Sequence, residues 1–484
     1  MELLVTLAAA PPRAGAVVGV LAGAGITVSL MQTLVIPLIP DLPALLHTGT
    51  ANASWAITST LLAAAVATPV AGRLGDLFGK RHVLVASTLL LVVGSVLCAL
   101  TSSLGPMVVG RTLQGMGAGV IPLGISIMRD VLPPERLGGA IALMSSSLGV
   151  GGAFGLPLSA VIAQHADWHV LFWASAGLGL VVTVLLLTVV PAPRPSAAGR
   201  FDAVGAVGLG AALVCLLLPV SKGGDWGWAS GTTLGLFGAA VVLLLVWGWW
   251  ELRSRSPLVD LRTTARPQVL LTNLASVVVG FAMYASSLVA PQLLELPKAT
   301  GYGLGQSLTS AGLWLVPSGL AMMAVSPLGA RLSAAYGPKV SLCAGSVVIC
   351  AGYLVALPLM GWTWGVLVFS AVTSAGIGLA YAAMPSLIMG AVPVADTAAA
   401  NGLNTLMRSI GTSSSSAVIG VVTAHMTRTF GGQPVPSEGA FHTAFVIAGG
   451  AALVAALVTL AIPAGRPVRP KAPSPSTEQA QAGA

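Results

Sequence analysis

A short charged turn between residues 71 and 82 separates two long apolar stretches. Its glycines and charged residues are Gly72, Arg73, Gly75, Asp76, Gly79, Lys80 and Arg81. The glycines permit a tight turn and a close approach of neighbouring helices. The Asp76 carboxylate can accept hydrogen bonds from free N–H groups at the start of a helix, or from neighbouring arginines. The turn therefore has the chemistry of a contact between segments; an ordinary basic loop beside a membrane is the alternative.

Arg111 is a second candidate, because it lies inside the apolar run 106–128. A guanidinium group within a membrane span costs about 2.5–3.5 kcal/mol on insertion scales, so a polar cavity or a partner must offset that cost. A structural tie to backbone carbonyl oxygens is the alternative to a functional role. None of the fourteen Asp and Glu residues lies mid-span, and the nearest are Asp41 and Glu295. Glu295 is either a proton site or a loop charge paired with Lys298.

Polar and adaptable side chains within the apolar runs are candidates for the lining of a central cavity, because such groups in lipid face the interior of a helix bundle. They are Gln32, Thr33, Asn273, Tyr284, Trp314, Met384, Asn404 and Arg408. For each of them, simple packing is the alternative. A cavity without acidic side chains would suit neutral or anionic amphipathic compounds better than cations, with Arg408 as the counter-charge.

Two further patterns give no prediction of a metal or a cofactor. His165, Asp167 and His169 have the spacing of metal ligands on a helix, but they fall in a short loop beside Trp168. The alternating glycines of residues 115–119 resemble a nucleotide-binding loop, but they lie within a span and no G-K-[ST] follows. We therefore predict no metal site and no cofactor.

The elements that position these residues are membrane helices. Of the 484 residues, 55% are hydrophobic and 7% are charged, whereas soluble domains carry roughly 25% charge. The long unbroken apolar runs exclude a β-barrel, which needs alternation, and the 59 glycines suit closely packed helices. The net charge of +8 is scattered over short loops, so it does not indicate nucleic-acid binding.

Fourteen runs approach the roughly 20 apolar residues that a bilayer-crossing helix needs. They are residues 15–37, 53–72, 83–101, 106–128, 138–162, 169–190, 203–221, 231–250, 268–291, 307–328, 339–358, 363–388, 400–424 and 442–463. Alternate loops hold seventeen basic residues on one side against three on the other, with two inside spans, which accounts for all 22. This bias predicts that both termini are cytoplasmic.

An internal repeat divides the chain into two related halves. Residues 68–74 and 326–332 match at an offset of 258 positions, and residues 115–131 resemble 376–392 at a similar offset. A repeat of this length indicates paired helical bundles. The predicted organisation is an N-terminal six-helix bundle (1–190), a linker with two extra spans (191–267), a C-terminal six-helix bundle (268–463) and a disordered cytoplasmic tail (464–484).

The motifs resemble those of the major facilitator superfamily. Residues 72–81 (GRLGDLFGKR) fit its G-x-L-[AG]-D-x-x-G-[RK]-[RK] loop between spans two and three, and residues 111–119 (RTLQGMGAG) resemble its R-x-x-Q-G-x-G-x-[AG] segment in span four. Six plus two plus six spans resembles the fourteen-span drug:proton antiporter branch. The resemblance implies an all-α polytopic membrane protein with two six-helix bundles and two extra central helices.

The resemblance also implies roles for particular residues. The loop around Asp76 is expected to latch one half to the other in one conformation, and Arg111 is expected to take part in proton coupling. Span five holds Gly151, Gly155, Pro157 and Ser159, which match the antiporter signature G-P-x-x-G-G in part. The chain departs from the family at Met31, where an acidic residue is expected. The second copy of the loop carries Ala334 and Pro338 at the positions of Asp76 and Lys80, so the latch is one-sided.

These observations predict an exporter of drug-like or antibiotic-like small molecules in a prokaryotic plasma membrane. The predicted drive is proton antiport with alternating access, its proton carriers being Asp41, Glu295 or Asp76, tuned by Arg111. Protons, the lipid bilayer and the small-molecule substrate are the expected partners of a monomer that is not an enzyme. A facilitator or importer that is not coupled to protons is one alternative, and a membrane receptor or scaffold that does not transport is another.

Overall fold

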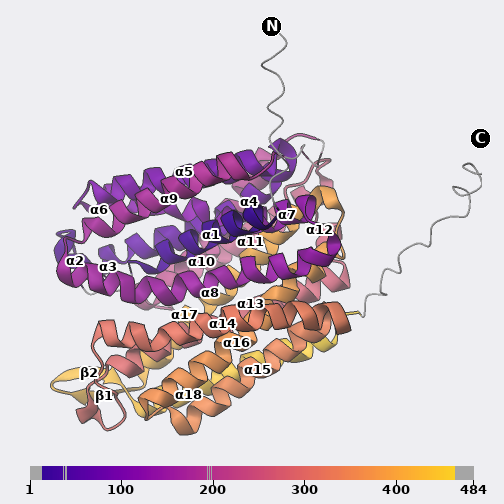
Figure 1. Ribbon diagram of the computed structural model, residues 1–484. Coiled ribbons are helices and arrows are strands. Elements are labelled where there is room, and N and C mark those ends of the chain that lie inside the picture. Colours follow the sequence, from indigo (N-terminus) through magenta and orange to yellow (C-terminus); the bar gives the residue numbers. More distant parts are fainter. Residues whose placement is uncertain are drawn as a thin grey trace, which may run out of the picture.

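The computed structural model describes residues 14–35, 38, 41–192, 195, 197 and 199–463. The predicted tail 464–484 lies outside the described residues, and so does the end of the first predicted span at residues 36 and 37. The described chain is almost entirely helical, and its long helices run in a common direction (Figure 1).

The first part of the chain forms a bundle of long helices, drawn from indigo to magenta in Figure 1. Its elements are α1 (Ala14–Thr33), α2 (Leu42–Leu45), α3 (Thr50–Ala53), α4 (Trp55–Phe78), α5 (Lys80–Ala99), α6 (Leu104–Gly115), the 3-10 turn η2 (Met116–Gly119), α7 (Val120–Val131), α8 (Pro134–His165) and α9 (His169–Val189). Gly79, with a φ of 100°, makes the sharp turn between α4 and α5.

The second bundle follows an inserted helical pair. The pair and its short successor are α10 (Ala203–Trp226), α11 (Gly231–Arg253) and α12 (Leu261–Thr264). The second bundle consists of α13 (Pro267–Glu295), η3 (Lys298–Thr300), α14 (Leu308–Tyr336), α15 (Pro338–Leu359), α16 (Thr363–Met389), η4 (Val394–Asp396), α17 (Thr397–His425), β1 (Thr427–Phe430), β2 (Gln433–Pro436) and α18 (Glu438–Leu460). Gly337, with a φ of 90°, turns the chain between α14 and α15, at the position that the repeat pairs with Gly79.

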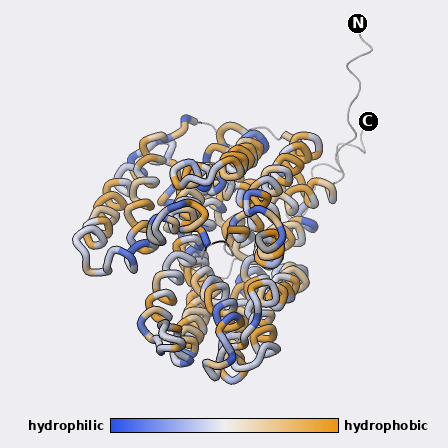
Figure 2. The backbone as a smooth tube through the Cα atoms, turned by 90° about the vertical axis from the view of Figure 1, so that its left-hand side faces the viewer, coloured by the Kyte–Doolittle hydropathy of each residue, from blue (hydrophilic) through white to orange (hydrophobic). Residues whose placement is uncertain are grey.

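Twelve helices among the described residues are long and apolar enough to cross a membrane, and stretches of hydrophobic residues run along the helices (Figure 2). Two of the fourteen predicted spans are not among the twelve. The run 106–128 is divided by η2 into α6 and α7, each of which has only 12 residues. The run 400–424 lies in α17, whose length is sufficient but whose sequence is rich in asparagine, serine and threonine and contains Arg408.

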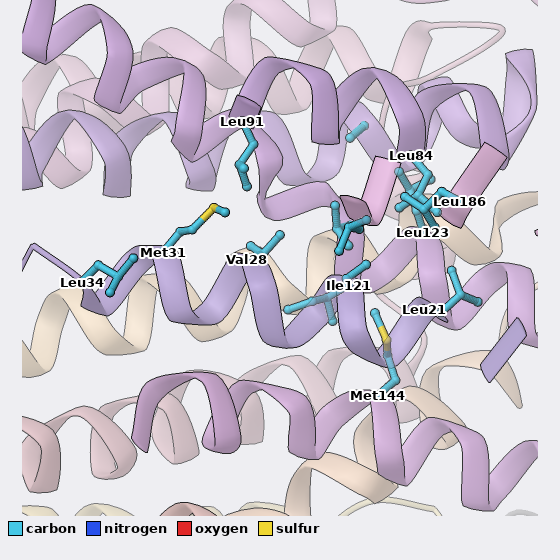
Figure 3. Packing of buried hydrophobic residues seen from close by; sticks show 14 of the residues in the cluster. Leu21, Val28, Met31, Leu34, Leu84, Leu91, Ile121, Leu123, Met144 and Leu186 are labelled. Carbon is cyan, nitrogen blue, oxygen red and sulfur yellow. The ribbon is translucent and has the colours of Figure 1, made fainter. Parts of the chain in front are cut away.

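Each bundle has its own apolar core. The first core draws on α1, α5, α7, α8 and α9. Figure 3 shows its side chains Leu21, Val28 and Met31 from α1, Leu34 just after α1, Leu84 and Leu91 from α5, and Ile121 and Leu123 from α7. The second core is formed mainly by α13, α14, α15, α16 and α18. Close packing of side chains stabilises helix bundles in lipid, so two separate cores allow each bundle to hold its shape independently of the other.

The inserted pair lies against both bundles. Leu209, Leu213 and Leu217 of α10 share an apolar cluster with Ala65 of α4 and with Leu403 and Leu406 of α17. On α11, by contrast, only Thr233, Ala240 and Glu251 are buried. The pair is therefore anchored through α10, and α11 presents most of its surface outward.

A β-hairpin joins α17 to α18, where the sequence had indicated only helices and loops. β1 and β2 pair antiparallel, and the turn between them uses Gly431 and Gly432 at positive φ, which glycine adopts without strain. Arg428 donates to the carbonyl oxygen of Thr300 at 2.9 Å, and the Tyr302 hydroxyl donates to that of Pro436. The hairpin is thus fixed to the loop between α13 and α14.

Close helix packing in the second bundle gives a direct test of this fold. A Cβ atom added at Gly345 of α15 would lie 2.6 Å from the carbonyl oxygen of Gly376 and 2.7 Å from the backbone nitrogen of Ala380, both on α16. We expect Gly345→Ala to destabilise the protein by about 1–3 kcal/mol, because the two backbones must move apart. The measurement is the midpoint of thermal unfolding of the purified protein, followed by tryptophan fluorescence.

The matched control is Gly235→Ala on α11, where an added Cβ would meet no atom within 4 Å. Its melting temperature should be unchanged or slightly higher, because alanine favours a helix over glycine. Equal melting temperatures for the two variants would contradict the predicted packing of α15 on α16.

Candidate functional site

The Asp76 carboxylate joins the two bundles. The backbone nitrogens of Ala398 and Ala399, in the first turn of α17, donate to its two oxygens at 3.3 and 2.9 Å. The first N–H groups of a helix have no partner within the helix, and the helix dipole favours a negative charge there. The carboxylate is fully buried, so these two N–H groups take the place of water in stabilising its negative charge.

The other charged residues of the loop divide into two groups. Arg73 also reaches the second bundle, with its Nη1 3.1 Å from Asp396 Oδ1. Lys80 remains within the first bundle, 2.6 Å from Asp130 and 3.9 Å from Asp76. Arg81 donates to a backbone carbonyl of α9 in the same bundle. We call the contacts of Arg73 and Asp76 with α17 and η4 the latch.

Arg129 of α7 adds a third polar contact between the bundles that the sequence did not indicate. Its Nη1 donates to the Thr397 hydroxyl at 2.5 Å. It comes from the end of α7, so the first turn of α17 is held by residues from two helices of the first bundle.

Small residues let α4 and α17 approach closely enough to form the latch. A Cβ atom on Gly72 would lie 2.4 Å from the carbonyl oxygen of Ala398, and one on Gly402 would lie 2.8 Å from that of Thr68. Gly75, in contrast, faces Leu123 within the first bundle. The three loop glycines therefore serve three purposes: contact between bundles at Gly72, packing within one bundle at Gly75, and the turn at Gly79.

A second close contact between the bundles lies along α8 and α14. A Cβ on Gly319 would lie 2.3 Å from Ala153 and 2.6 Å from the carbonyl oxygen of Gly149, and one on Gly312 would lie 3.1 Å from Pro157. Of the four residues that the sequence singled out on α8, Pro157 thus faces α14, whereas the other three face the α1 side. Gly151 approaches Ser29, Gly155 approaches Thr33, and the Ser159 hydroxyl donates to the carbonyl oxygen of Leu34.

A cavity of about 330 Å³ lies between the bundles, lined by residues from both. Four predicted lining residues are among those that line it: Gln32, Thr33, Tyr284 and Arg408. The sequence analysis missed most of the hydroxyl groups of the wall, which are Ser29, Thr68, Ser286, Ser287, Ser318, Ser370, Ser374, Thr405, Ser409, Thr412 and Ser413. A serine or threonine in a membrane helix often bonds its own backbone, so sequence alone does not mark it as a cavity residue.

Arg408 is the one charged residue among the described residues that line the cavity. Its guanidinium carbon lies 4.7 Å from the centre of the Tyr381 ring, and its Nη2 is 3.5 Å from the Thr405 hydroxyl. No carboxylate in the described ranges lies within 4 Å of it in an ion pair. The cavity is therefore a hydroxyl-lined space with one positive charge in its wall.

The comparisons with known proteins decide the family. The family description "Major Facilitator Superfamily" matches residues 21–415, and a second match covers residues 272–483. The chain belongs to the major facilitator superfamily. This places it among membrane transporters rather than enzymes, as a multi-pass membrane protein.

The relatives of this chain within the superfamily include a protein named as an exporter. It is 29% identical over 418 residues to an uncharacterized MFS-type transporter of Mycobacterium tuberculosis, covering 84% of this chain and 60% of that protein. It is 29% identical to the tetracenomycin C resistance and export protein of Streptomyces glaucescens, covering 82% and 73%. It is 26% identical to the multidrug resistance protein Stp of Mycobacterium tuberculosis, covering 83% and 74%. The chain thus spans less than two thirds of the first relative's length.

Two solved structures share the facilitator fold. The crystal structure of the human organic anion transporter MFSD10 aligns with a TM-score of 0.65 at 15% identity, covering 93% of this chain and all of the other. The proton:xylose symporter XylE aligns with a TM-score of 0.63 at 14% identity, covering 93% and 96%.

The remaining residues that the sequence predicted to line the cavity lie outside its wall. Asn404 donates to Asn273 Oδ1 at 2.9 Å and to the Ser276 hydroxyl at 2.7 Å, and Ser276 in turn contacts the sulfur of Met384. These four form a buried polar tie between α13, α16 and α17, because an amide can satisfy another amide. Trp314 packs edge-on against a neighbouring indole of α16, 5.0 Å away.

The proton-coupling candidates lie apart from one another. Arg111 is buried within the first bundle, where its Nε donates to the carbonyl oxygen of Ala56 at 2.9 Å and its Nη1 to Gln114 at 2.6 Å. These contacts are those of the structural tie that the sequence left open. Asp41 and Glu295 are both exposed, and Glu295 forms no ion pair with Lys298 within 4 Å in the described chain.

The latch can be tested by replacing its buried charge. We expect Asp76→Asn to weaken the latch by about 1–2 kcal/mol, or a factor of about 5–30 in the ratio of latched to unlatched molecules, because the helix dipole loses its negative partner. Spin labels on His82→Cys and Val340→Cys, at the starts of α5 and α15, report the separation of the bundles by double electron–electron resonance. The labels require replacement of the native Cys98, Cys215, Cys343 and Cys350 by alanine.

Glu135→Gln is the control, since it removes an exposed carboxylate at the start of α8. Asp76→Asn should increase the population of longer distances, and Glu135→Gln should leave the distribution unchanged. Identical distributions for wild type and Asp76→Asn would mean that the carboxylate does not hold the bundles together.

Proposed function

We propose that this chain exports drug-like or antibiotic-like small molecules across the plasma membrane by alternating access, coupled to proton entry. The observation that carries the proposal is a cavity whose wall is formed by both bundles. The latch joins the same two bundles at one end. Rocking of the bundles about such a cavity would expose it to the two sides in turn. The names of the Streptomyces and Mycobacterium relatives, which are export and multidrug resistance proteins, support the direction.

The same proposal places fourteen spans in the membrane, with the latch on the cytoplasmic side. Two further spans would add to the twelve apolar helices. One consists of α6, η2 and α7, which together would form a single broken span. The other is α17, which is flanked by both cores and has its polar residues turned toward α13 and the cavity. Basic residues gather in the loops at the latch end, which supports a cytoplasmic location for that end and for both termini.

We further propose that the substrates are neutral or anionic amphipathic molecules. Arg408 supplies a positive charge without a carboxylate partner, and the hydroxyl groups supply weak, adaptable hydrogen bonds. A carboxylate or phosphate-like group on a substrate would form a charge-assisted bond with Arg408 while its apolar part contacts the leucines, glycines and alanines of the wall. A cation would be repelled by the same guanidinium group.

The proton carrier that we propose is Asp76, with Glu295 and Asp41 as exposed alternatives. Asp76 alone of the three is buried at the contact between bundles, so opening of the latch would change its surroundings from helix N–H groups to cytoplasmic water. Arg111 would support this coupling by holding α6 against α4, which makes it a positioning residue.

Arg408 gives the test of substrate class. Arg408→Gln should reduce export of an anionic amphiphile by about 10- to 100-fold, which corresponds to loss of a charge-assisted hydrogen bond of about 1.5–3 kcal/mol. Export is measured as the minimum inhibitory concentration and as the efflux rate of a fluorescent anionic compound in an efflux-deficient host. Arg331→Gln, which removes an exposed arginine, should leave both unchanged. Equal export of a quaternary cation by wild type and Arg408→Gln, with no transport of anions, would overturn the proposed substrate class.

Proton coupling has its own test in proteoliposomes. Addition of substrate should dissipate an imposed pH gradient, as read by a trapped pH-sensitive dye, and Arg111→Ala should abolish this flux. Arg136→Ala, at an exposed position near the start of α8, serves as the control. Substrate movement without proton movement would replace the antiporter by the uncoupled facilitator, and full coupling in Arg111→Ala would remove that residue from the mechanism.

A further inference from the structure

The inserted helical pair contains a buried acid that neither the latch nor the cavity uses. Glu251, near the end of α11, is only 3% exposed. Its Oε2 accepts a hydrogen bond from the backbone nitrogen of Val259 at 3.4 Å, and its Oε1 has no hydrogen-bond partner among the described residues. The indole of Trp247 lies beside Glu251, and its Nε1 donates to the carbonyl oxygen of Gly205 at 3.0 Å.

The carboxyl group of Asp202 lies close to that of Glu251, beside Gly205 of α10. A Cβ atom added at Gly205 would lie 2.5 Å from Glu251 Oε1 and 3.0 Å from Asp202 Oδ2. Asp202 itself is satisfied, because it accepts hydrogen bonds from the backbone nitrogen of Gly205 at 2.7 Å and from Trp250 Nε1 at 2.9 Å. The unpartnered oxygen of Glu251 and the carboxyl group of Asp202 therefore both lie beside Gly205.

Within the described ranges, no cationic side chain pairs with either of these two carboxyl groups. No lysine, arginine or histidine in the described part of the chain lies within 4 Å of either carboxyl group in an ion pair. The nearby Arg253 lies over the Trp249 ring, 4.3 Å from its centre, and Arg262 donates to the carbonyl oxygen of Leu252 at 3.4 Å. A buried carboxylate without a cation and beside a like charge is unfavourable, so Glu251 is most stable with a proton bound.

Glu251 is connected to the latch through the segment that follows α11. This segment, residues 254–264, we call the strap. Leu258 and Val259 of the strap are buried in the apolar cluster that α4, α10 and α17 share. The next strap residue, Asp260, lines a cleft of about 160 Å³ together with Arg73 and Asp396, the ion pair of the latch.

We infer that Glu251 is a proton-binding site facing the cytoplasmic end, and that its protonated form holds the strap against α4 and α17 and so favours the latched state. The inference rests on the proposed function, because it takes the latch to open and close during transport. When the strap leaves α11, Glu251 meets water and loses its proton more readily. The sign follows: acid favours the docked strap and the latched state, and rising pH releases both.

The spin-label pair on His82→Cys and Val340→Cys tests this in the full-length chain in nanodiscs. The latched fraction is measured across about pH 5 to 9, the range in which buried carboxyl groups titrate. In the wild type it should fall as the pH rises, by at most about tenfold in the latched-to-unlatched ratio per pH unit, the limit for one proton. Glu251→Gln, which mimics the protonated acid, should stay at the low-pH value throughout.

Asp202→Asn provides a second variant, since asparagine also caps a helix. Removing the neighbouring charge makes Glu251 easier to ionise, so the transition should move to lower pH. Glu135→Gln, with its exposed carboxyl group, should retain the wild-type profile. Monodisperse elution of each variant on size exclusion establishes that it is folded.

The possible outcomes separate this inference from the proposed function. Bundles that keep one separation at every pH, with and without substrate, overturn alternating access and the inference with it. Bundles that separate with substrate but show no dependence on pH, or a pH profile that Glu251→Gln leaves unchanged, overturn the proton-binding role of Glu251 alone.

Discussion

The arrangement of the two bundles depends on one buried charge at the start of one helix. Asp76 has no exposed surface, and its oxygens reach the backbone nitrogens of Ala398 and Ala399. A buried carboxylate is costly unless donors replace the water that it loses. The first turn of α17 supplies such donors without introducing a mobile side chain, and its dipole adds a favourable field. The contact therefore has a well-defined closed geometry, and it exists only when the bundles meet.

This charge can reach its donors only because the backbones are close. Gly72 and Gly402 leave no room for a side chain between α4 and α17, and Gly149 and Gly319 do the same between α8 and α14. Two narrow contacts of this kind hold the bundles together, with the cavity between them. Because each bundle has a separate core, separation at one contact does not require either bundle to unfold.

The sequence predicted the parts of this arrangement that are local. The loop around Asp76, the repeat and the apolar runs indicated the helices and the paired bundles, but the partners of Asp76 lie more than 320 positions away and no local pattern marks them. Of the polar residues that the sequence indicated within spans, Gln32, Thr33, Tyr284 and Arg408 lie in the wall of the cavity. Asn273 and Asn404 lie outside that wall, where the Asn404 amide donates to Asn273 Oδ1 within the second bundle.

The inserted pair lies outside the repeat, and its position constrains how the bundles can move. α10 contacts α4 and α17 together, so it must stay with one of them when they separate. Apolar contacts have no preferred direction and tolerate sliding, whereas the hydrogen bond from Val259 to Glu251 is directional and is lost on a small displacement. The strap is therefore the element of the insertion whose docking depends on a directional contact.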